Sequence, residues 1–393
     1  MIIIFKGAYK MEFNYGIPCT VFFGEGRSKE IGGIVSGMGA KKVFCVYDKG
    51  IAKVATGVVN SLKDAGIEVV EFDGVLPNPP DTLVEEAAQK CKDAGVDIIV
   101  AVGGGSPIDC AKAINILLTN PSPINQYDGL NMVKCPTKPL IAIPTTAGTG
   151  SEVTTFSIVT DTKKQKKMVI AGQFVGATIA IVDPELTVGM PPAITASTGM
   201  DALTHAIEAY VSIAHQIPAD VNSLKAIELI AGNIKEATFN GKNLVARTNM
   251  LLGSMLAGFA FSNAVLGLVH GIAHPLSVRC GLPHGVANAI LLPYVMEFNA
   301  PVVPERTVDI GRAIGLELDG LSREEAINKT IAKVFELNKE LKIPTLKEAG
   351  VEKSKFALLA DDTLRDGAEG GASFFNPKQA TKEEIIAILE KSY

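Results

Sequence analysis

An almost wholly apolar run, Asp97-Ile98-Ile99-Val100-Ala101-Val102, constrains the fold of this chain more than any other segment. A strand that is apolar on both sides is typical of the interior of a parallel sheet covered by helices on both faces. Helical patterns separate the first runs of this kind, for example over residues 81–94, where Asp81 is expected to cap the helix. This alternation predicts βαβ units and a doubly wound parallel sheet. The other predicted strands cover residues 41–47, 67–72, 140–143 and 179–182.

The pattern changes after Gly189-Met190-Pro191-Pro192, a cluster of residues that break regular structure. No convincing β-rich run follows it. The sequence therefore predicts an α/β domain over residues 1–190 and an all-helical domain over residues 191–393, and a length of 393 residues suits two domains. The long helical patterns of the second half cover residues 193–212, 219–237, 244–261 and 324–341.

Composition excludes several classes of protein. Lys and Arg total 37 against 42 for Asp and Glu, so the chain lacks the basic character of a protein that binds nucleic acid or an anionic membrane. Its six cysteines include no Cys-x-x-Cys pair, which is typical of reduced intracellular thiols. Residues 1–6 lack the pattern of a signal peptide, and no apolar stretch approaches the roughly 20 residues that span a bilayer. We therefore expect a cytoplasmic protein.

A second methionine, Met11, follows the first ten residues. Residues 1–10 are either a short ordered extension or a consequence of the choice of start site. The sequence leaves these two alternatives open.

A glycine turn, Gly103-Gly104-Gly105-Ser106-Pro107, directly follows the buried run and opens a helical pattern. Glycines let backbone amides approach an anion, and a helix N-terminus adds free N–H groups and a favourable dipole. The turn therefore predicts a pyrophosphate site, although it matches neither Gly-x-Gly-x-x-Gly nor the P-loop. A plain tight turn is the alternative.

Two further features follow predicted strands. The segment Thr145-Thr146-Ala147-Gly148-Thr149-Gly150-Ser151 is dense in hydroxyls, as in a loop that lines a cofactor, and an ordinary polar turn is its alternative. Asp48 follows the strand at residues 41–47. An acid at this place can bind the diol of an adenine ribose and repel a 2′-phosphate, which favours NAD over NADP. Its alternative is a helix cap or turn aspartate.

Four of the five histidines lie in short motifs of the second half. Asp201 and His205 are four residues apart in a helical pattern, His270 and His274 repeat this spacing, and His284 follows across a loop. A spacing of four places both side chains on one face of a helix. One carboxylate with three imidazoles predicts a site for Fe, Zn, Mn or Co, and spacing alone leaves His274 among the candidate ligands. A satisfied core histidine is the alternative for each.

Together these motifs resemble the iron-dependent (group III) alcohol dehydrogenase family, from Gly24 to about Pro377. Within the family, residues 270–299 are most similar to the lactaldehyde reductase (propanediol oxidoreductase) branch. The resemblance implies the dehydroquinate synthase-like architecture, a homo-oligomer, and hydride transfer between a small primary alcohol or diol and C4 of a nicotinamide. Its most specific stretches are residues 103–109, 145–152, 199–210 and 267–275.

The resemblance also implies roles for individual residues. It assigns the metal, Fe²⁺ with Zn²⁺ or another divalent ion as an alternative, to Asp201, His205, His270 and His284. It places His274 beside the nicotinamide, as a proton-relay or cofactor-positioning residue. The implied contacts with NAD(H) are Asp48, Asn78, Gly104, Gly105, Ser106, Asp109, Thr145, Thr146, Thr149, Thr154 and Lys167. Without the resemblance, Lys167 is a solvated charge in a lysine-rich hairpin.

The substrate is less constrained than the cofactor. Three aromatic residues, Phe156, Phe259 and Phe261, are candidates for an apolar pocket, and at least one is expected in the core. Arg279, between His274 and His284, suggests an aldehyde with an anionic tail. The segment 369–375 departs from the shorter link expected there, which leaves the rim of the pocket open.

Other activities compete with this interpretation. Glycerol dehydrogenases and dehydroquinate synthases share the architecture, and the Asp201-x-x-x-His205 and His270-x-x-x-His274 pair argues against them. A metal- and nucleotide-binding sensor or an assembly subunit is the alternative without catalysis. His215 is expected to be an ordinary loop residue.

Overall fold

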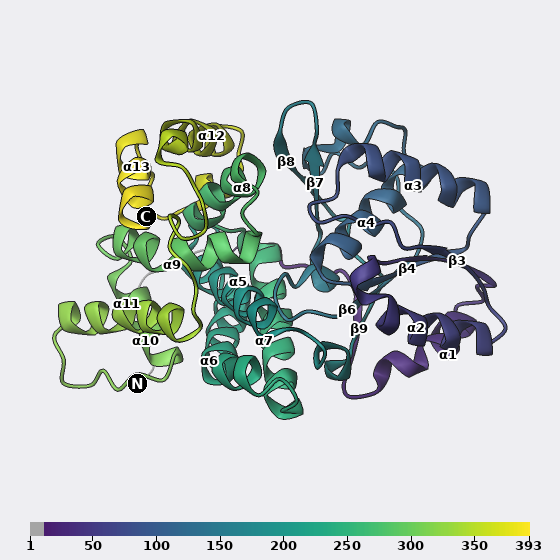
Figure 1. The fold of residues 1–393 in the computed structure, drawn as a ribbon, viewed down its shortest axis with the longest axis horizontal. Coiled ribbons are helices and arrows are strands. Elements are labelled where there is room, and N and C mark those ends of the chain that lie inside the picture. The colour runs from purple at the N-terminus through teal and green to yellow at the C-terminus, as the bar shows by residue number, and fades with distance from the viewer. Residues whose placement is uncertain (1–11) are drawn as a thin grey trace.

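Six parallel strands form the centre of the N-terminal domain in the computed structural model, which describes residues 12–393 (Figure 1). Their order is β1-β9-β6-β4-β2-β3, and helices cover the sheet, as the alternating pattern predicts. The strands are β1 (Thr20–Phe23), β2 (Lys42–Val46), β3 (Glu68–Phe72), β4 (Ile98–Gly103), β6 (Leu140–Pro144) and β9 (Ile179–Val182). The helices between them are α1 (Ile31–Gly37), α2 (Ala52–Asp64), α3 (Asp81–Ala94) and α4 (Gly105–Thr119).

The five predicted strands of this sheet are confirmed, and β1 is an addition. It has four residues and lies at the edge of the sheet, where it pairs only with β9, so its apolar pattern is too short to detect. The predicted cap of α3 is wrong. Pro80 is the N-cap residue, because its extended backbone precedes the first turn. The Asp81 carboxylate instead accepts hydrogen bonds from Thr82 N and Thr162 Oγ1.

A smaller sheet lies between the two domains (Figure 1). Strands β7 (Phe156–Asp161) and β8 (Lys166–Ala171) form an antiparallel hairpin, and β5 (Gly129–Leu130) pairs with β8. The hairpin contacts the C-terminal domain through two side-chain pairs. Lys166 Nζ lies 2.8 Å from Glu369 Oε2, and Arg279 Nη1 donates to Gln165 Oε1 at 3.0 Å.

Helices alone follow β9 in the described part of the chain, as predicted. The long central helix α5 packs against α6, α7 and α9 in one apolar core. Helices α8 and α9 escaped prediction because Pro275 and Pro293 interrupt their patterns. The helices are α5 (Pro192–Val211), α6 (Ile217–Phe239), α7 (Leu244–Ala264), α8 (Leu268–Cys280), α9 (His284–Asn299), α10 (Pro304–Ala313), α11 (Arg323–Glu340), α12 (Phe356–Ala368) and α13 (Lys382–Lys391).

Helix α7 corrects one expectation from sequence. Among residues 12–393 it is the one helix long and apolar enough, by composition, to cross a membrane. The protein buries 61% of its apolar window, and Arg247 within it is 1% exposed and hydrogen-bonded to Thr195 and Gly241. Its apolar character therefore serves the core. The alternatives for residues 1–10 lie outside the described residues.

Candidate active site

Four predicted metal ligands converge from three helices. Asp201 and His205 come from α5, His270 from the first turn of α8, and His284 from the start of α9. The Nε2 atoms of His205, His270 and His284 lie 3.8, 3.9 and 3.8 Å from Asp201 Oδ1, and the four ligand atoms are all within 4.8 Å of one another. In a tetrahedral site with bonds of about 2.0–2.2 Å, ligand atoms are about 3.3–3.6 Å apart. The spacing therefore fits a transition-metal ion if the ligand atoms move slightly closer together when it binds.

The protonation of the histidines also fits a metal. Burial lowers the pKa of His270 and of His284 well below the ordinary value, so both are neutral, as metal ligands must be. His205 Nδ1 faces the carbonyl oxygen of Gly148 at 3.2 Å, and His270 Nδ1 faces Glu208 Oε2 at 2.5 Å. A proton on Nδ1 would satisfy each of these oxygens and would leave the Nε2 lone pair for a metal.

Asn288 marks the point at which these lone pairs converge. Its Nδ2 atom lies 2.6 Å from Asp201 Oδ1, 3.0 Å from His270 Nε2 and 3.2 Å from His284 Nε2. One donor thus contacts three of the four ligand atoms, which are all aimed at the same small volume. A cation would use the same lone pairs.

His274 lies beside this group and outside it. Its ring centroid is 6.0 Å from that of His270 and 5.5 Å from that of His284. Burial, followed by the charge of Lys167, lowers its pKa well below the ordinary value. His274 is therefore a neutral imidazole at the edge of the ligand cluster.

The glycine turn and the hydroxyl-rich loop meet at the carboxyl edge of the sheet. Gly103 on β4 pairs with Pro144 on β6, so the segments that follow these strands are neighbours. A Cβ atom at Gly105 would lie 2.7 Å from Thr149 Cγ2, so this close approach requires glycine. Ser106 Oγ accepts a hydrogen bond from Asn78 N at 3.3 Å. The glycine turn therefore lies with Asn78 and Thr149 at the N-terminus of α4, the place at which a pyrophosphate is expected to bind.

Asp48 and Thr145 also lie at the carboxyl edge of the sheet, and they differ in their hydrogen bonds. The Asp48 carboxylate accepts a hydrogen bond from Gly50 N at 2.8 Å and so caps a short 3₁₀ turn, which was the alternative considered for it. This bond uses one of its two oxygens. Thr145 is 3% exposed, and its Oγ1 atom has no hydrogen-bond partner among the described residues.

Two predicted cofactor contacts belong to a buried polar cluster. Asp109 Oδ1 accepts from Ser151 Oγ at 2.5 Å. Thr154 is 1% exposed, and its Oγ1 lies 3.1 Å from Lys112 Nζ. The structure therefore places the Thr154 side chain inside the protein, against a lysine that sequence reasoning missed. The signal for Lys112 was a lone charge in the apolar stretch that follows Cys110.

Lys167 extends from β8 toward the ligand cluster and is half-buried. Burial lowers its pKa to about 8, against the opposing charges of Asp201 and Asp109. It therefore brings a positive charge between the candidate metal and cofactor sites, unlike the solvated lysine that the hairpin pattern alone suggests.

The candidate substrate residues separate into two groups. Phe261 stacks on the His205 ring at 4.5 Å and on Phe156 at 6.1 Å, and it belongs to a small buried cluster near the ligands. Phe259 belongs to the main core of the helical domain. Arg279 was the candidate for binding an anionic substrate. Its Nε atom donates to Asp362 Oδ2 at 2.8 Å, so its guanidinium group is already paired with a carboxylate. His215 lies outside the cluster and contacts Asp220.

The segment 369–375 packs against helix α8 through a 3₁₀ turn, Ala372–Phe375. A Cβ atom at Gly271 would lie 2.7 Å from Ser373 Cβ, so the segment closely approaches the helix that carries His270 and His274.

Sequence reasoning also missed Glu208 and Asn288. Glu208 follows Asp201 by seven residues and His205 by three, and Asn288 follows His284 by four. Both spacings place a polar side chain on the same helical face as a ligand, and this was the signal available.

Comparison with known protein families identifies the family of this chain. The pattern described as "Iron-containing alcohol dehydrogenase" matches residues 18–184, and that described as "Fe-containing alcohol dehydrogenase family, C-terminal" matches residues 195–393. The chain belongs to the iron-containing alcohol dehydrogenase family. The resemblance predicted from the motifs is thereby confirmed, and so is its implication of an oxidoreductase of the alcohol dehydrogenase and aldehyde reductase type.

Individual members of the iron-containing alcohol dehydrogenase family match over almost their whole length. The 1,3-propanediol dehydrogenase of Klebsiella pneumoniae is 42% identical over 391 residues, which cover 98% of this chain and 100% of the relative. The lactaldehyde reductase of Escherichia coli (strain K12) is 40% identical over 379 residues, which cover 95% of this chain and 98% of that protein.

Solved structures of the family confirm the architecture. The crystal structure of a 1,3-propanediol oxidoreductase has a TM-score of 0.94 at 41% identity and covers 98% of this chain and 100% of that one. The sulfoacetaldehyde reductase from Bifidobacterium kashiwanohense, in complex with NAD⁺, has a TM-score of 0.86 at 31% identity and covers 97% of this chain and 99% of that one.

Proposed function

We propose that this protein interconverts small primary alcohols or diols and their aldehydes, with NAD(H) as the hydride carrier and Fe²⁺ as the metal. The observation that carries the proposal is the group of Asp201, His205, His270 and His284, whose ligand atoms converge within 4.8 Å. A glycine turn at the start of α4, which suits a pyrophosphate, and a neutral His274 support the proposal. The 1,3-propanediol dehydrogenase and lactaldehyde reductase relatives support the substrate class.

Each part of the chain has a defined task in this proposal. The bound metal would supply a Lewis acid that polarises the oxygen of the alcohol or aldehyde. The backbone N–H groups that follow Gly104 hold the pyrophosphate, and Thr149 and Lys167 orient the nicotinamide half of the cofactor. His274 accepts the hydroxyl proton of the alcohol on its free ring nitrogen and returns it during aldehyde reduction. Phe156 and Phe261 exclude water from the substrate.

We further propose a cytoplasmic homo-oligomer, with a domain boundary near residue 190 and no nucleic-acid or membrane partner. The supporting observations are the near balance of 37 basic and 42 acidic residues and the six cysteines, none of which forms a disulfide in the structure. Asp48, at the carboxyl end of β2, supports NAD over NADP.

A reconstitution experiment tests the proposal. The full chain is stripped of metal, reloaded without oxygen with Fe²⁺ or with Zn²⁺, and supplied with NAD⁺ and a panel of short alcohols and diols. We expect NADH formation that depends on the metal and is lost in Asp201→Ala. A panel of neutral and carboxylate-bearing aldehydes with NADH tests the anionic alternative. NAD binding without turnover under any metal would contradict the proposal.

A further inference from the structure

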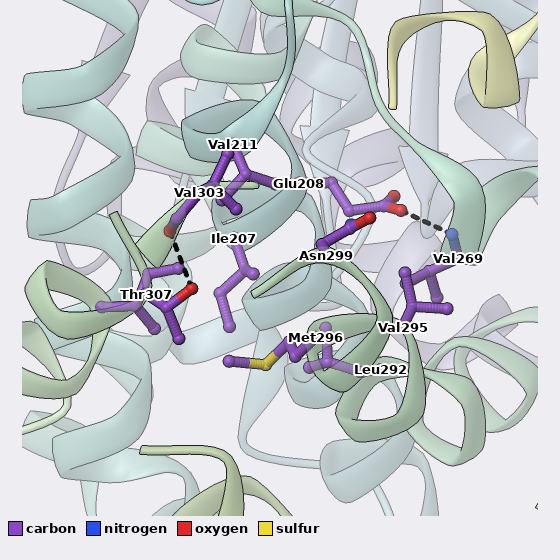
Figure 2. Close-up of a pocket in the computed structure, with 11 residues that line it drawn as sticks. Ile207, Glu208, Val211, Val269, Leu292, Val295, Met296, Asn299, Val303 and Thr307 are labelled. Carbon is purple, nitrogen blue, oxygen red and sulfur yellow. Dashed lines mark hydrogen bonds between the residues drawn. The ribbon is translucent and has the colours of Figure 1, made fainter. Parts of the chain in front are cut away.

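Glu208 is a buried carboxylate to which neither the motifs nor the proposed function gives a role. It lies on α5, on the face that carries Asp201 and His205, and it is 2% exposed. Its oxygens accept two hydrogen bonds from the start of α8. Val269 N donates to Oε1 (Figure 2), at a distance of 2.6 Å, and His270 Nδ1 lies 2.5 Å from Oε2.

The surroundings of Glu208 prevent solvent from replacing these partners. The carboxylate lies at the edge of a cavity of about 10 Å³ whose walls are mainly apolar, and Ile207, Val295 and Met296 are among them (Figure 2). A space of this size holds about one water molecule. A buried carboxylate is tolerated only when its oxygens are hydrogen-bonded, so the two donors of α8 hold Glu208 in a fixed position.

The same carboxylate caps the N-terminus of α8. This helix begins after Gly267, which has no side chain to cap it. Asn376 Oδ1 accepts from Leu268 N at 3.1 Å, and Glu208 accepts from Val269 N. A negative charge at a helix N-terminus is favourable. Glu208 on α5 thus holds both the first turn of α8 and the ring of His270 in that turn.

Glu208 differs from the partners of the other two histidines. A neutral imidazole carries one proton, and a carboxylate at Nδ1 keeps that proton there. His205 Nδ1 faces a backbone carbonyl, and His284 Nδ1 has no hydrogen-bond partner among the described residues. In the described part of the chain, Glu208 is therefore the one side chain hydrogen-bonded to the Nδ1 atom of a candidate ligand.

We propose that Glu208 is a positioning residue for the metal, which holds His270 as its Nδ1–H tautomer and so keeps Nε2 free to bind. Its negative charge, with that of Asp201, also balances the two positive charges of a divalent ion in a buried site. This proposal rests on the metal binding proposed above, and it adds a residue that touches neither substrate nor metal.

Glu208→Gln tests the tautomer directly because it preserves the shape of the side chain. If the amide turns its NH₂ group toward His270, Nδ1 must become an acceptor, and the ring proton moves to Nε2, where it blocks the metal. If the amide turns the other way, its NH₂ group faces the N–H of Val269, and two donors oppose each other. Both orientations weaken metal binding.

The measurement is the Zn²⁺ affinity of the metal-free full chain, in competition with a chromophoric chelator. We expect Glu208→Gln to bind Zn²⁺ about 10–100-fold more weakly than the parent. Glu208→Asp keeps a carboxylate, so we expect a smaller loss. The imidazole nitrogen chemical shifts of the metal-free chain, which has five histidines, report whether His270 has changed tautomer.

Asn376→Ala is the matched control, since it removes a cap of α8 without a contact to His270. It should lower thermal stability and change Zn²⁺ affinity by less than about threefold. Equal affinity of Glu208→Gln and the parent, equal losses in Glu208→Gln and Asn376→Ala, or a metal-free parent in which His270 carries its proton on Nε2 would overturn the role of Glu208. A parent chain that binds no Zn²⁺ or Fe²⁺ would instead overturn the proposed function, and this inference with it.

Discussion

Lys112 Nζ lies 2.6 Å from the carbonyl oxygen of Phe156, which ties helix α4 to the first residue of β7. The lysine is 1% exposed, and oxygens of Ser151 and Thr154 lie within 3.1 Å of the same atom. Burial lowers the pKa of Lys112 to about 8. This ammonium group therefore takes the place of solvent inside the turn that follows the candidate cofactor loop, and it fixes the conformation of that turn.

Lys112→Met should destabilise the protein and weaken its binding of NAD⁺. The substitution keeps the apolar stem but leaves buried carbonyl oxygens without a donor, so we expect the free energy of unfolding to fall by at least about 3 kcal/mol. Denaturant unfolding measures this change. Lys90→Met is the control, since Lys90 forms an exposed pair with Glu86 and should contribute less than about 1 kcal/mol. Similar effects of both substitutions would contradict this account.

Glu152 should make stability depend on pH. Burial raises its pKa from 4.5 to about 7, and its Oε1 atom has no hydrogen-bond partner among the described residues. Between about pH 4.5 and pH 7, the folded protein therefore keeps a proton on Glu152 that the unfolded chain releases. The resulting stability is complete below about pH 4.5 and is lost as the pH rises through about 7. Glu152→Gln should remove this dependence.

Thermal unfolding of the parent and of Glu152→Gln across this pH range measures the effect. At a pH above 7 we expect the variant to be more stable by about 1–3 kcal/mol, because it buries no charge. Their difference should shrink toward acid pH. Two parallel profiles would show that Glu152 is not the group responsible.

The sequence predicts the layout of this fold because long apolar patterns report burial directly. The run at residues 97–102 has no polar face, so it can only lie inside a sheet covered on both sides, and it becomes β4. Strand β1 and the hairpin of β7 and β8 lie at edges or between domains, where burial is partial and the pattern is weak. Helices α8 and α9 were not predicted because a proline inside each one, Pro275 or Pro293, interrupts the helical pattern.

The ligand cluster was predictable, whereas its supporting residues were not. Asp201 and His205 reveal themselves by their spacing on one helix. The approach of Glu208 to His270 depends on how α5 packs against α8, and local sequence does not encode that contact. Likewise, Lys112 is conspicuous as a charge in an apolar stretch, but its partners come from the turn at residues 151–156, which is remote in sequence.

Gly105→Ala should weaken NAD⁺ binding with little effect on stability outside the site. The added Cβ atom would lie 2.7 Å from Thr149 Cγ2 and displace the loop that faces the glycine turn. We expect the KM for NAD⁺ to rise by about tenfold, which corresponds to about 1.4 kcal/mol. Gly57→Ala in α2 is the control, since its Cβ atom meets nothing within 4 Å. An unchanged KM in Gly105→Ala would place the cofactor elsewhere.

Asp48→Ser should reduce the preference for NAD⁺ over NADP⁺. The carboxylate at the end of β2 repels a 2′-phosphate, and serine keeps a hydroxyl that can cap the adjacent turn. We expect kcat/KM with NADP⁺ relative to NAD⁺ to rise by about tenfold or more. Steady-state rates with both cofactors measure the ratio, and Asp64→Asn, at the exposed end of α2, serves as the control. A constant ratio would assign the discrimination to another residue.

Removal of the metal should destabilise the helical domain, because the ligands join three helices. A ligand that binds only the folded state adds about 4 kcal/mol of stability when its concentration is 1,000 times its Kd. Thermal unfolding with saturating Zn²⁺ or Fe²⁺, and again after chelation, should therefore show a higher midpoint with metal. Asp201→Asn should abolish this difference, since the carboxylate lies 3.8–3.9 Å from all three imidazole Nε2 atoms. A metal-dependent shift that persists in Asp201→Asn would place the stabilising ion at another site.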